Sequence, residues 1–151
     1  MSNDMLAIIA PGQGSQSPGM LSPWLEDAQI LTMAQEISDA IGLDIVRLGT
    51  TADADEIRDT ANAQPLIVAA GLISAHALGA SGSFSYVAGH SVGEITAAAI
   101  AGALTPIDAM KLVRARGVEM AKAAGVTPSG MAAVLGGDRQ VVLSAIAELG
   151  L

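Results

Sequence analysis

The chain has 151 residues and a formal net charge of -8, with 51% hydrophobic but only 2% aromatic residues. This length allows a domain with a hydrophobic core, which aliphatic side chains must fill here. The lack of cysteine excludes disulfides and thiolate catalysis, and the acidic charge argues against nucleic acid and anionic membranes as partners.

Metal binding and membrane insertion are not expected. The two histidines, His76 and His90, are too few for a typical histidine-rich metal site. The N-terminus lacks the positively charged segment of a signal peptide. The longest apolar stretch, 66–80, is too short to span a bilayer. We therefore expect a cytoplasmic protein.

The first predicted strand is the continuous apolar run at 5–10, which Pro11 ends. A loop rich in glycine and polar side chains follows at 12–19. Beyond it, two helical segments are predicted, one over 26–41 and a short acidic one over 53–58.

A long apolar helix is predicted next, from Asn62 or Ala63 to about Gly79, with Pro65 in its first turn. The apolar run at 84–88 then predicts a second strand. Because strand and helix signals alternate along the chain, they favour a layered α/β domain.

The last part of the chain begins with a helix over 106–124, for which Thr105 provides an N-cap. Residues 126–130 are the best linker candidate. After them the pattern predicts a strand at 131–135 and a helix at 138–149. A lone strand and helix make an incomplete module, so we expect this chain to be the front part of a longer protein.

The most informative motif is Gly89-His-Ser-Val-Gly93, which lies between the second predicted strand and a helix of small residues at 94–103. This is the strand–turn–helix context of a G-x-S-x-G nucleophile elbow. In such a turn the backbone of Ser91 is strained, and its hydroxyl lies at the N-terminus of the following helix. Negative charge that develops there is stabilised by free N–H groups and the helix dipole. The alternative is a plain glycine-rich turn.

A nucleophilic serine needs a base, and the sequence offers no convincing one. His90 is adjacent to Ser91, and adjacent residues in a tight turn usually point apart, so we interpret it as a hydrogen-bonding support for the elbow. His76 lies in the apolar helix and is interpreted as a histidine without chemistry. Glu94 fits on spacing alone, but it is expected to cap or pair locally.

One arginine of the helix over 106–124 is out of place. Lys111, Arg114 and Lys122 share one face, which is expected to be solvated. Arg116 falls instead within the apolar stripe, where a guanidinium must find an anion or a cluster of carbonyls. Either it forms an ion pair with a core-facing acid, or its planar fork binds a substrate carboxylate.

Four motifs together resemble those of malonyl-CoA:acyl carrier protein transacylases, and the resemblance covers essentially the whole chain. The motifs are Ala10-Pro-Gly-Gln-Gly-Ser-Gln16, Gln64-Pro65, Gly89-His-Ser-Val-Gly-Glu94 and Arg116-Gly117.

The resemblance implies a fold and a domain organisation. It implies an α/β class with an α/β-hydrolase-like parallel sheet domain, of which residues 1–128 are the N-terminal part. Residues 129–151 would begin an inserted, ferredoxin-like small domain.

The resemblance also implies roles for the residues of the motifs. Ser91 matches the acyl-carrying nucleophile, and the backbone N–H groups of Gln13 and Val92 would form the oxyanion hole. Arg116 would hold the malonyl carboxylate. Two further residues would complete the site: Gln64, lining the acyl pocket, and His90, supporting the elbow.

This sequence departs from the family in three ways. It has Ala10 and Val92 where the family more often has phenylalanine and leucine, and both changes keep an apolar residue. The family's catalytic histidine follows the inserted domain and is absent from this chain. We therefore expect the chain to be inactive alone.

The implied reaction moves a malonyl group from coenzyme A to the pantetheine thiol of acyl carrier protein through a malonyl-serine intermediate. No cofactor is expected besides the thioester substrate, and the intact enzyme is expected to be a monomer. Two alternatives are an esterase or thioesterase of the α/β-hydrolase class and a non-catalytic acyl-CoA-binding fragment. A cation in the apolar stripe disfavours a lipase. The basic cluster of Lys111, Arg114 and Lys122 could meet an acidic carrier protein, although a plain solvated face is the stronger interpretation.

Overall fold

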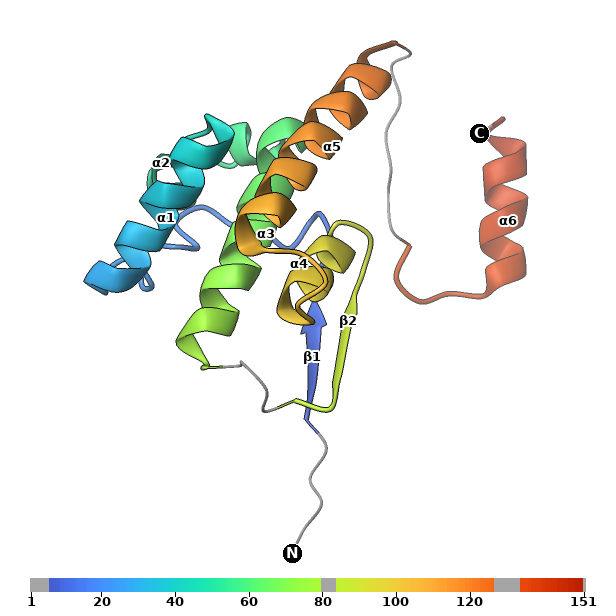
Figure 1. Ribbon diagram of the computed structural model, residues 1–151. Coiled ribbons are helices and arrows are strands. Elements are labelled where there is room, and N and C mark those ends of the chain that lie inside the picture. Colours follow the sequence, from blue (N-terminus) through green and yellow to red (C-terminus); the bar gives the residue numbers. More distant parts are fainter. Residues whose placement is uncertain (1–5, 80–83, 127–133, 151) are drawn as a thin grey trace, which may run out of the picture.

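The computed structural model describes residues 6–79, 84–126 and 134–150 (Figure 1). Its sheet consists of two parallel strands, β1 (Ala7–Ala10) and β2 (Tyr86–Gly89), paired from Ala7 opposite Tyr86 to Ala10 opposite Gly89. Both predicted strands are confirmed within two residues at each end. The chain between them forms helices, as parallel pairing requires a crossover. The described residues thus form a mixed α/β fold with a small parallel sheet.

The helices account for most of the described chain, and six of them were predicted, although α4 ends three residues earlier than expected. The helices are α1 (Ala28–Ile41), α2 (Ile45–Thr50), the short 3-10 helix η1 (Glu56–Arg58), α3 (Thr60–Ala77), α4 (Gly93–Ile100), α5 (Pro106–Val126) and α6 (Arg139–Glu148).

Local capping explains where the helices begin and end. Asp27 caps α1 by accepting a 2.7 Å hydrogen bond from Gln29 N, and α1 ends at Gly42 in the left-handed region at φ 61°. The unpredicted helix α2 is only six residues long and begins at a similar cap, where Asp44 accepts from Arg47 N at 2.9 Å. A segment this short gives too few apolar repeats for a periodic signal.

Helix α3 begins earlier than predicted, because Asp59 caps it by accepting a 2.7 Å hydrogen bond from Ala61 N. With Thr60 as the first helical residue, Pro65 is the sixth and lies inside the helix. Its predicted place in the first turn is therefore wrong, and the helix lacks one internal hydrogen bond at this point.

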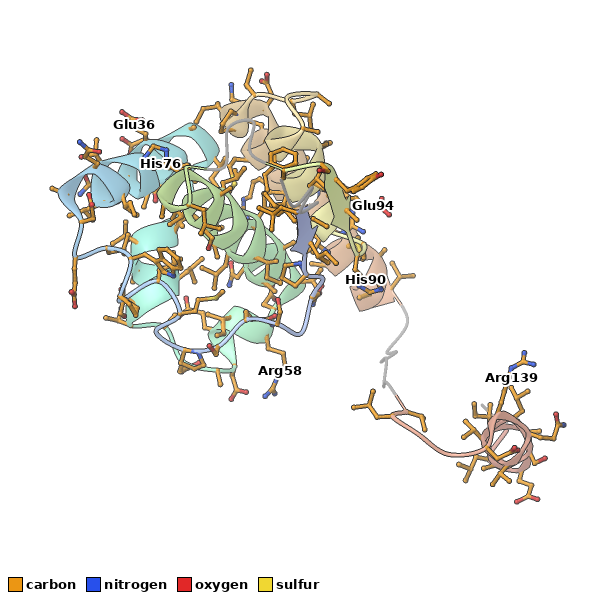
Figure 2. All side chains as sticks on the ribbon, turned by 90° about the horizontal axis from the view of Figure 1, so that it is seen from below. Glu36, Arg58, His76, His90, Glu94 and Arg139 are labelled. Atoms are coloured by element: carbon orange, nitrogen blue, oxygen red, sulfur yellow. The ribbon has the colours of Figure 1, made fainter. Side chains whose placement is uncertain are left out.

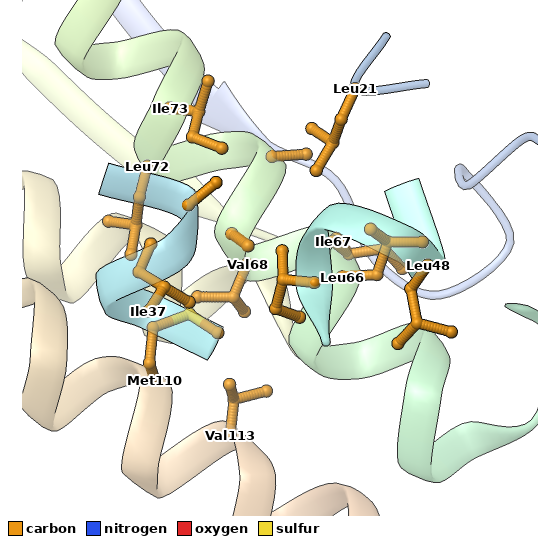
Figure 3. Close-up of a cluster of buried hydrophobic side chains, with 14 of the residues drawn as sticks. Leu21, Ile37, Leu48, Leu66, Ile67, Val68, Leu72, Ile73, Met110 and Val113 are labelled. Carbon is orange, nitrogen blue, oxygen red and sulfur yellow. The ribbon is translucent and has the colours of Figure 1, made fainter. Parts of the chain in front are cut away.

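Helix α3 forms the centre of the core, with α1 and α2 on one side and α5 on the other (Figure 1). Its residues from Ala63 to Ala70 are all buried. Figure 3 shows Leu66, Val68 and Leu72 of α3 among side chains from α1, α2 and α5. Each buried aliphatic side chain of this size contributes about 1.5–3 kcal/mol, so this helix is the main source of stability.

The sheet is covered on one face by α4, which contacts both strands. Ile9 of β1 is 76% exposed and Tyr86 of β2 is 62% exposed. A parallel sheet normally has both faces covered by helices, so the exposure of these two side chains is unusual for such strands.

The last helix, α6, stands apart from the other helices in Figure 1, and none of its residues is buried. The predicted strand at 131–135 lies mostly outside the described residues, and its last two residues, Val134 and Leu135, are not in a strand. Of the predicted linker, Val126 ends α5 and the rest lies outside the described residues.

None of the described helices combines the length and the apolar character that crossing a membrane requires.

Candidate active site

The motif around Ser91 forms a sharp turn between β2, which ends at Gly89, and α4, which begins at Gly93. Ser91 has φ 53°, and of the described residues that are not glycine it alone lies in the left-handed region. This conformation is strained for an L-residue with a side chain. Val92 is fully buried, whereas Ser91 is exposed, so the turn presents the hydroxyl to solvent.

The two glycines of the elbow are needed for space. A Cβ on Gly89 would collide with the backbone of Gly93 and Glu94. A Cβ on Gly93 would collide with Ala10 O and lie 2.6 Å from Pro11 O. Strand, turn and helix therefore approach more closely here than any larger residue permits.

The loop after β1 lies directly against the elbow. A Cβ on Gly12 would be 2.9 Å from His90 O, and His90 N donates a 3.0 Å hydrogen bond to Ala10 O. This contact holds the start of the loop that contains Gln13 against the turn.

Four backbone N–H groups at this junction have no acceptor among the described residues. The N–H groups of Gly93 and Glu94 donate to His90 O at 2.9 Å and Ser91 O at 3.0 Å. Those of Gly12, Gln13, Ser91 and Val92 donate to no acceptor within 6–79, 84–126 and 134–150. They include the N–H groups of Gln13 and Val92, the two donors that the resemblance implies for an oxyanion hole, and this role stays a prediction.

Arg116 of α5 reaches Ser91. Its Nη2 donates to Ser91 Oγ at 3.3 Å, and its Nη1 donates to Gln64 Oε1 at 2.6 Å. The side chain is half-buried, and in the described part of the chain it forms no ion pair with an acid. The first interpretation of Arg116, an ion pair in the core, is thus not found. The second interpretation, a site for a substrate carboxylate, stays a prediction.

The predicted apolar stripe around Arg116 is only partly buried. Val113 on α5 is buried, but Leu112 is 49% exposed and Met120 is 41% exposed. Arg116 therefore lies at the edge of the packed region, where its guanidinium can meet a ligand from solvent.

Gln64 is 1% exposed and connects Arg116 to the loop after β1. Its Nε2 donates to Met120 Sδ at 3.2 Å and, at the long distance of 3.4 Å, to Gln13 Oε1. Gln13 Nε2 in turn donates to Thr60 Oγ1 at 3.1 Å. A guanidinium can only donate, so Gln64 must accept from Arg116 with its oxygen and donate with its nitrogen. The direction of the hydrogen bonds from Arg116 through Gln64 and Gln13 to Thr60 is thereby fixed.

The structure thus brings together the predicted residues Ser91, Gln13, Gln64 and Arg116. It adds Met120 and Thr60, which sequence analysis missed. A methionine four residues after an arginine, or a threonine at a helix start, carries no signal of such a contact. The contact of Met120 with Gln64 depends on the packing of α3 against α5, and the contact of Thr60 with Gln13 depends on the loop after β1 lying against the start of α3.

The histidines and Glu94 take separate positions. The ring of His90 rests on Gly12, and in the described chain its hydrogen bonds are made by its backbone, so that backbone supports the elbow. The side chain of Glu94 is exposed in the first turn of α4. His76 is exposed on α3, far from His90 in Figure 2.

The basic face of α5 also differs from the prediction. Arg114 is half-buried, and its Nη1 donates a 2.9 Å hydrogen bond to Ala61 O of α3. Lys122 is paired with Glu119 at 2.7 Å. Of the three predicted cations, Lys111 and Lys122 are exposed, so the expectation of a solvated face is wrong for Arg114.

The described residues contain no cluster of three or more histidine, aspartate or glutamate side chains with the geometry of a metal site. The chemistry that the arrangement can perform is nucleophilic attack at an exposed, strained serine, next to free backbone donors and a guanidinium.

Comparison with known proteins shows the family of this chain. The model of the acyl transferase domain family matches residues 8–147, so the chain belongs to this family. Within it, the chain is 53% identical to the malonyl CoA-acyl carrier protein transacylase of Mycobacterium tuberculosis, over 97% of this chain and 50% of the relative. The resemblance indicated by the motifs is therefore confirmed.

Solved structures give the same result. The chain matches the crystal structure of MCAT from Mycobacterium tuberculosis with a TM-score of 0.87 and 52% identity, covering 97% of this chain and 50% of the other. It matches a malonyl-transacylase in complex with its type II PKS acyl-carrier protein with a TM-score of 0.80 and 30% identity, covering 97% and 48%. The chain spans about half the length of the Mycobacterium relatives that it matches.

Proposed function

We propose that this chain is the nucleophile-bearing half of a malonyl-CoA:acyl carrier protein transacylase. The observation that carries the proposal is the contact between Arg116 Nη2 and Ser91 Oγ at 3.3 Å. A thioester whose acyl group ends in a carboxylate can place that carboxylate on the guanidinium and its carbonyl carbon beside the hydroxyl. Malonyl is such a group, because one methylene separates its two carbonyl carbons.

In the first step, Ser91 Oγ attacks the thioester carbon and loses its proton to a general base. The oxyanion accepts hydrogen bonds from the N–H groups of Gln13 and Val92, each contributing about 3 kcal/mol to lowering the barrier. The C–S bond then breaks, coenzyme A leaves as the thiol after taking up a proton, and malonyl-serine remains.

In the second step, the pantetheine thiol of acyl carrier protein loses its proton and attacks the ester carbon. The C–O bond to Ser91 breaks, the serine oxygen takes back a proton, and the malonyl thioester leaves. The resemblance implies that the histidine that moves these protons would follow the inserted domain. The reaction is thus a property of the intact enzyme, and this chain alone is expected to be inactive.

We further propose the finer organisation implied by the resemblance. Residues 1–128 would belong to the large, α/β-hydrolase-like domain, and residues 129–151 would begin the small ferredoxin-like domain. Support comes from α6, which has no buried residue and stands apart from the other helices (Figure 1). The intact enzyme would be a cytoplasmic monomer that uses coenzyme A thioesters without a further cofactor.

The partner in this proposal is acyl carrier protein. Support comes from the related malonyl-transacylase whose structure was solved in complex with its acyl-carrier protein. With Arg114 turned toward α3, Lys111 and Lys122 are the exposed cations of α5 that could meet an acidic carrier protein.

A thioesterase or esterase is the competing enzyme, because water can replace the thiol in the second step. Arg116 argues against this alternative, since hydrolysis of a plain acyl ester has no need of a half-buried cation at the nucleophile. A non-catalytic fragment that only binds acyl-CoA is the competing binding protein.

The test uses a chimera of this chain with the C-terminal half of the Mycobacterium tuberculosis relative. It is incubated with malonyl-CoA and acyl carrier protein that carries pantetheine, and products are followed by mass spectrometry. Transfer to the carrier protein, abolished by Ser91→Ala, supports the proposal. Release of free malonate would indicate a hydrolase, and binding without turnover would indicate the non-catalytic alternative.

A further inference from the structure

A proline inside α3 leaves one carbonyl of this helix without its usual partner. Pro65 has no N–H, so the carbonyl of Ala61, four residues earlier, cannot accept the normal helical hydrogen bond. A carbonyl in this position must find another donor or lose free energy.

Arg114 supplies that donor from the neighbouring helix. Its Nη1 lies 2.9 Å from Ala61 O, and the side chain is half-buried between α5 and α3. The contact therefore replaces the hydrogen bond that Pro65 removes and joins α5 to the N-terminal turns of α3.

Gly117 makes this approach possible. A Cβ at this position would lie 3.1 Å from Thr60 O, 3.4 Å from Ala61 Cα and 3.6 Å from Pro65 Cδ. The backbone of α5 thus rests directly on the turn that contains the free carbonyl.

The two arginines of α5 lie on opposite sides of this contact. At about 100° per residue, Val113 and Gly117 mark the buried line of α5, with Arg114 about 80° to one side and Arg116 about 80° to the other. Arg114 is bonded to Ala61 O, and Arg116 is bonded to Gln64 Oε1. A rotation of α5 that lengthens the first contact also moves the guanidinium of Arg116.

We propose that Arg114 is a positioning residue for Arg116. By occupying the carbonyl that Pro65 frees, it fixes the rotation of α5 on α3 and with it the place of the Arg116 guanidinium beside Ser91. This inference rests on the proposed function, since it concerns the selection of a carboxylate-bearing acyl group.

The test compares Arg114→Met, which keeps the apolar stem but removes the donors, with Arg114→Lys, which keeps one charged donor. In the chimera, we expect Arg114→Met to lower the preference for malonyl over acetyl transfer by about tenfold, because small displacements of a binding group are costly. Arg114→Lys should recover part of it. The matched control is Arg47→Met, which removes an exposed arginine on α2.

A second substitution separates positioning from stability. Alanine at position 65 restores an N–H for Ala61 O, so adding Pro65→Ala to Arg114→Met should recover the melting temperature that Arg114→Met loses, roughly 4 °C. It should not recover the malonyl preference, because the contact that fixes the rotation of α5 on α3 is still missing. The melting temperatures are measured on the chimera and on this chain alone.

Two results would overturn the inference. One is an unchanged malonyl preference in Arg114→Met, and the other is recovery of both the preference and the melting temperature by Pro65→Ala. Failure of the proposed function looks different: the chimera with Arg114 intact would then transfer no malonyl group, or Arg116→Ala would leave its acyl preference unchanged. In that case the positioning role proposed for Arg114 would be wrong as well.

Discussion

Arg116 Nη2 lies 3.3 Å from Ser91 Oγ, although the two residues are separated by 25 positions and belong to different elements. Ser91 is held by a strained turn before α4, and the Arg116 guanidinium on α5 is held by a 2.6 Å hydrogen bond to Gln64 of α3. Three elements therefore meet at one point, and the consequences can be tested element by element.

The first prediction concerns acyl selectivity. In the chimera, Arg116→Ala should reduce malonyl transfer by about two orders of magnitude and acetyl transfer far less, because acetyl has no carboxylate to pair. Arg116→Lys should recover only part of the malonyl transfer, since lysine keeps the charge without the planar fork. Rates with both thioesters are compared at equal enzyme concentration. An equal loss for the two substrates would contradict the carboxylate role.

The second prediction concerns the strain at Ser91. Glycine tolerates φ 53° at no steric cost, so Ser91→Gly should be more stable than Ser91→Ala by about 1 kcal/mol. Both variants lose the hydroxyl and should be inactive in the chimera. Urea unfolding of the two variants measures the difference. Equal midpoints would mean that the serine backbone carries no strain.

The third prediction concerns the packing of the elbow. Gly93→Ala should destabilise the chain by about 3 kcal/mol, because the added Cβ meets Ala10 O and Pro11 O. The matched control is Gly125→Ala in α5, whose Cβ meets nothing within 4 Å. The control should be neutral or gain up to about 1 kcal/mol from helix propensity. Thermal unfolding followed by circular dichroism distinguishes the two, and a neutral Gly93→Ala would show that the strand and helix can separate.

The fourth prediction concerns pH. Arg47 and Glu56 form a bidentate ion pair between α2 and η1. The hydrogen bond from Arg47 lowers the pKa of Glu56, and the same pair raises the pKa of Arg47. Because the pKa of Glu56 is lower in the folded state, the pair stabilises the fold above the usual glutamate pKa of about 4.3, and this contribution disappears as the pH falls through the lowered value.

The pH effect is measured as the difference in melting temperature between the unsubstituted chain and Glu56→Gln. We expect a small difference at pH 7, since the pair is at the surface, and this difference should shrink as the pH falls below the usual glutamate pKa. Glu36→Gln, on the exposed face of α1 (Figure 2), is the control for removing a surface carboxylate. A difference for Glu56→Gln that grows toward acid pH would reverse the assigned sign.

Sequence reasoning found the elements whose signals are local. The two strands, the capped helix α1 with Gly42 at its end, and the elbow all depend on neighbouring residues. It placed Pro65 in a first turn, because the start of α3 depends on a cap at Asp59 that was not recognised. It missed α2, because a six-residue helix gives too few apolar repeats for a periodic signal. It also assigned Arg114 to solvent, because helical periodicity gives a face and not the neighbour that the face meets.

The amino-acid sequence by itself determined that Ser91 lies on a glycine-flanked turn between a strand and a helix, and that Arg116 departs from the charged face of its helix. Only the tertiary structure decided that Arg116 reaches Ser91 and Gln64, that Gln64 reaches Met120, and that Arg114 takes the carbonyl left free by Pro65. The physical reason is that turns and caps are set by bonds within a few residues. The contacts of the site depend instead on how closely α5 rests on α3, and a glycine at position 117 makes that distance possible.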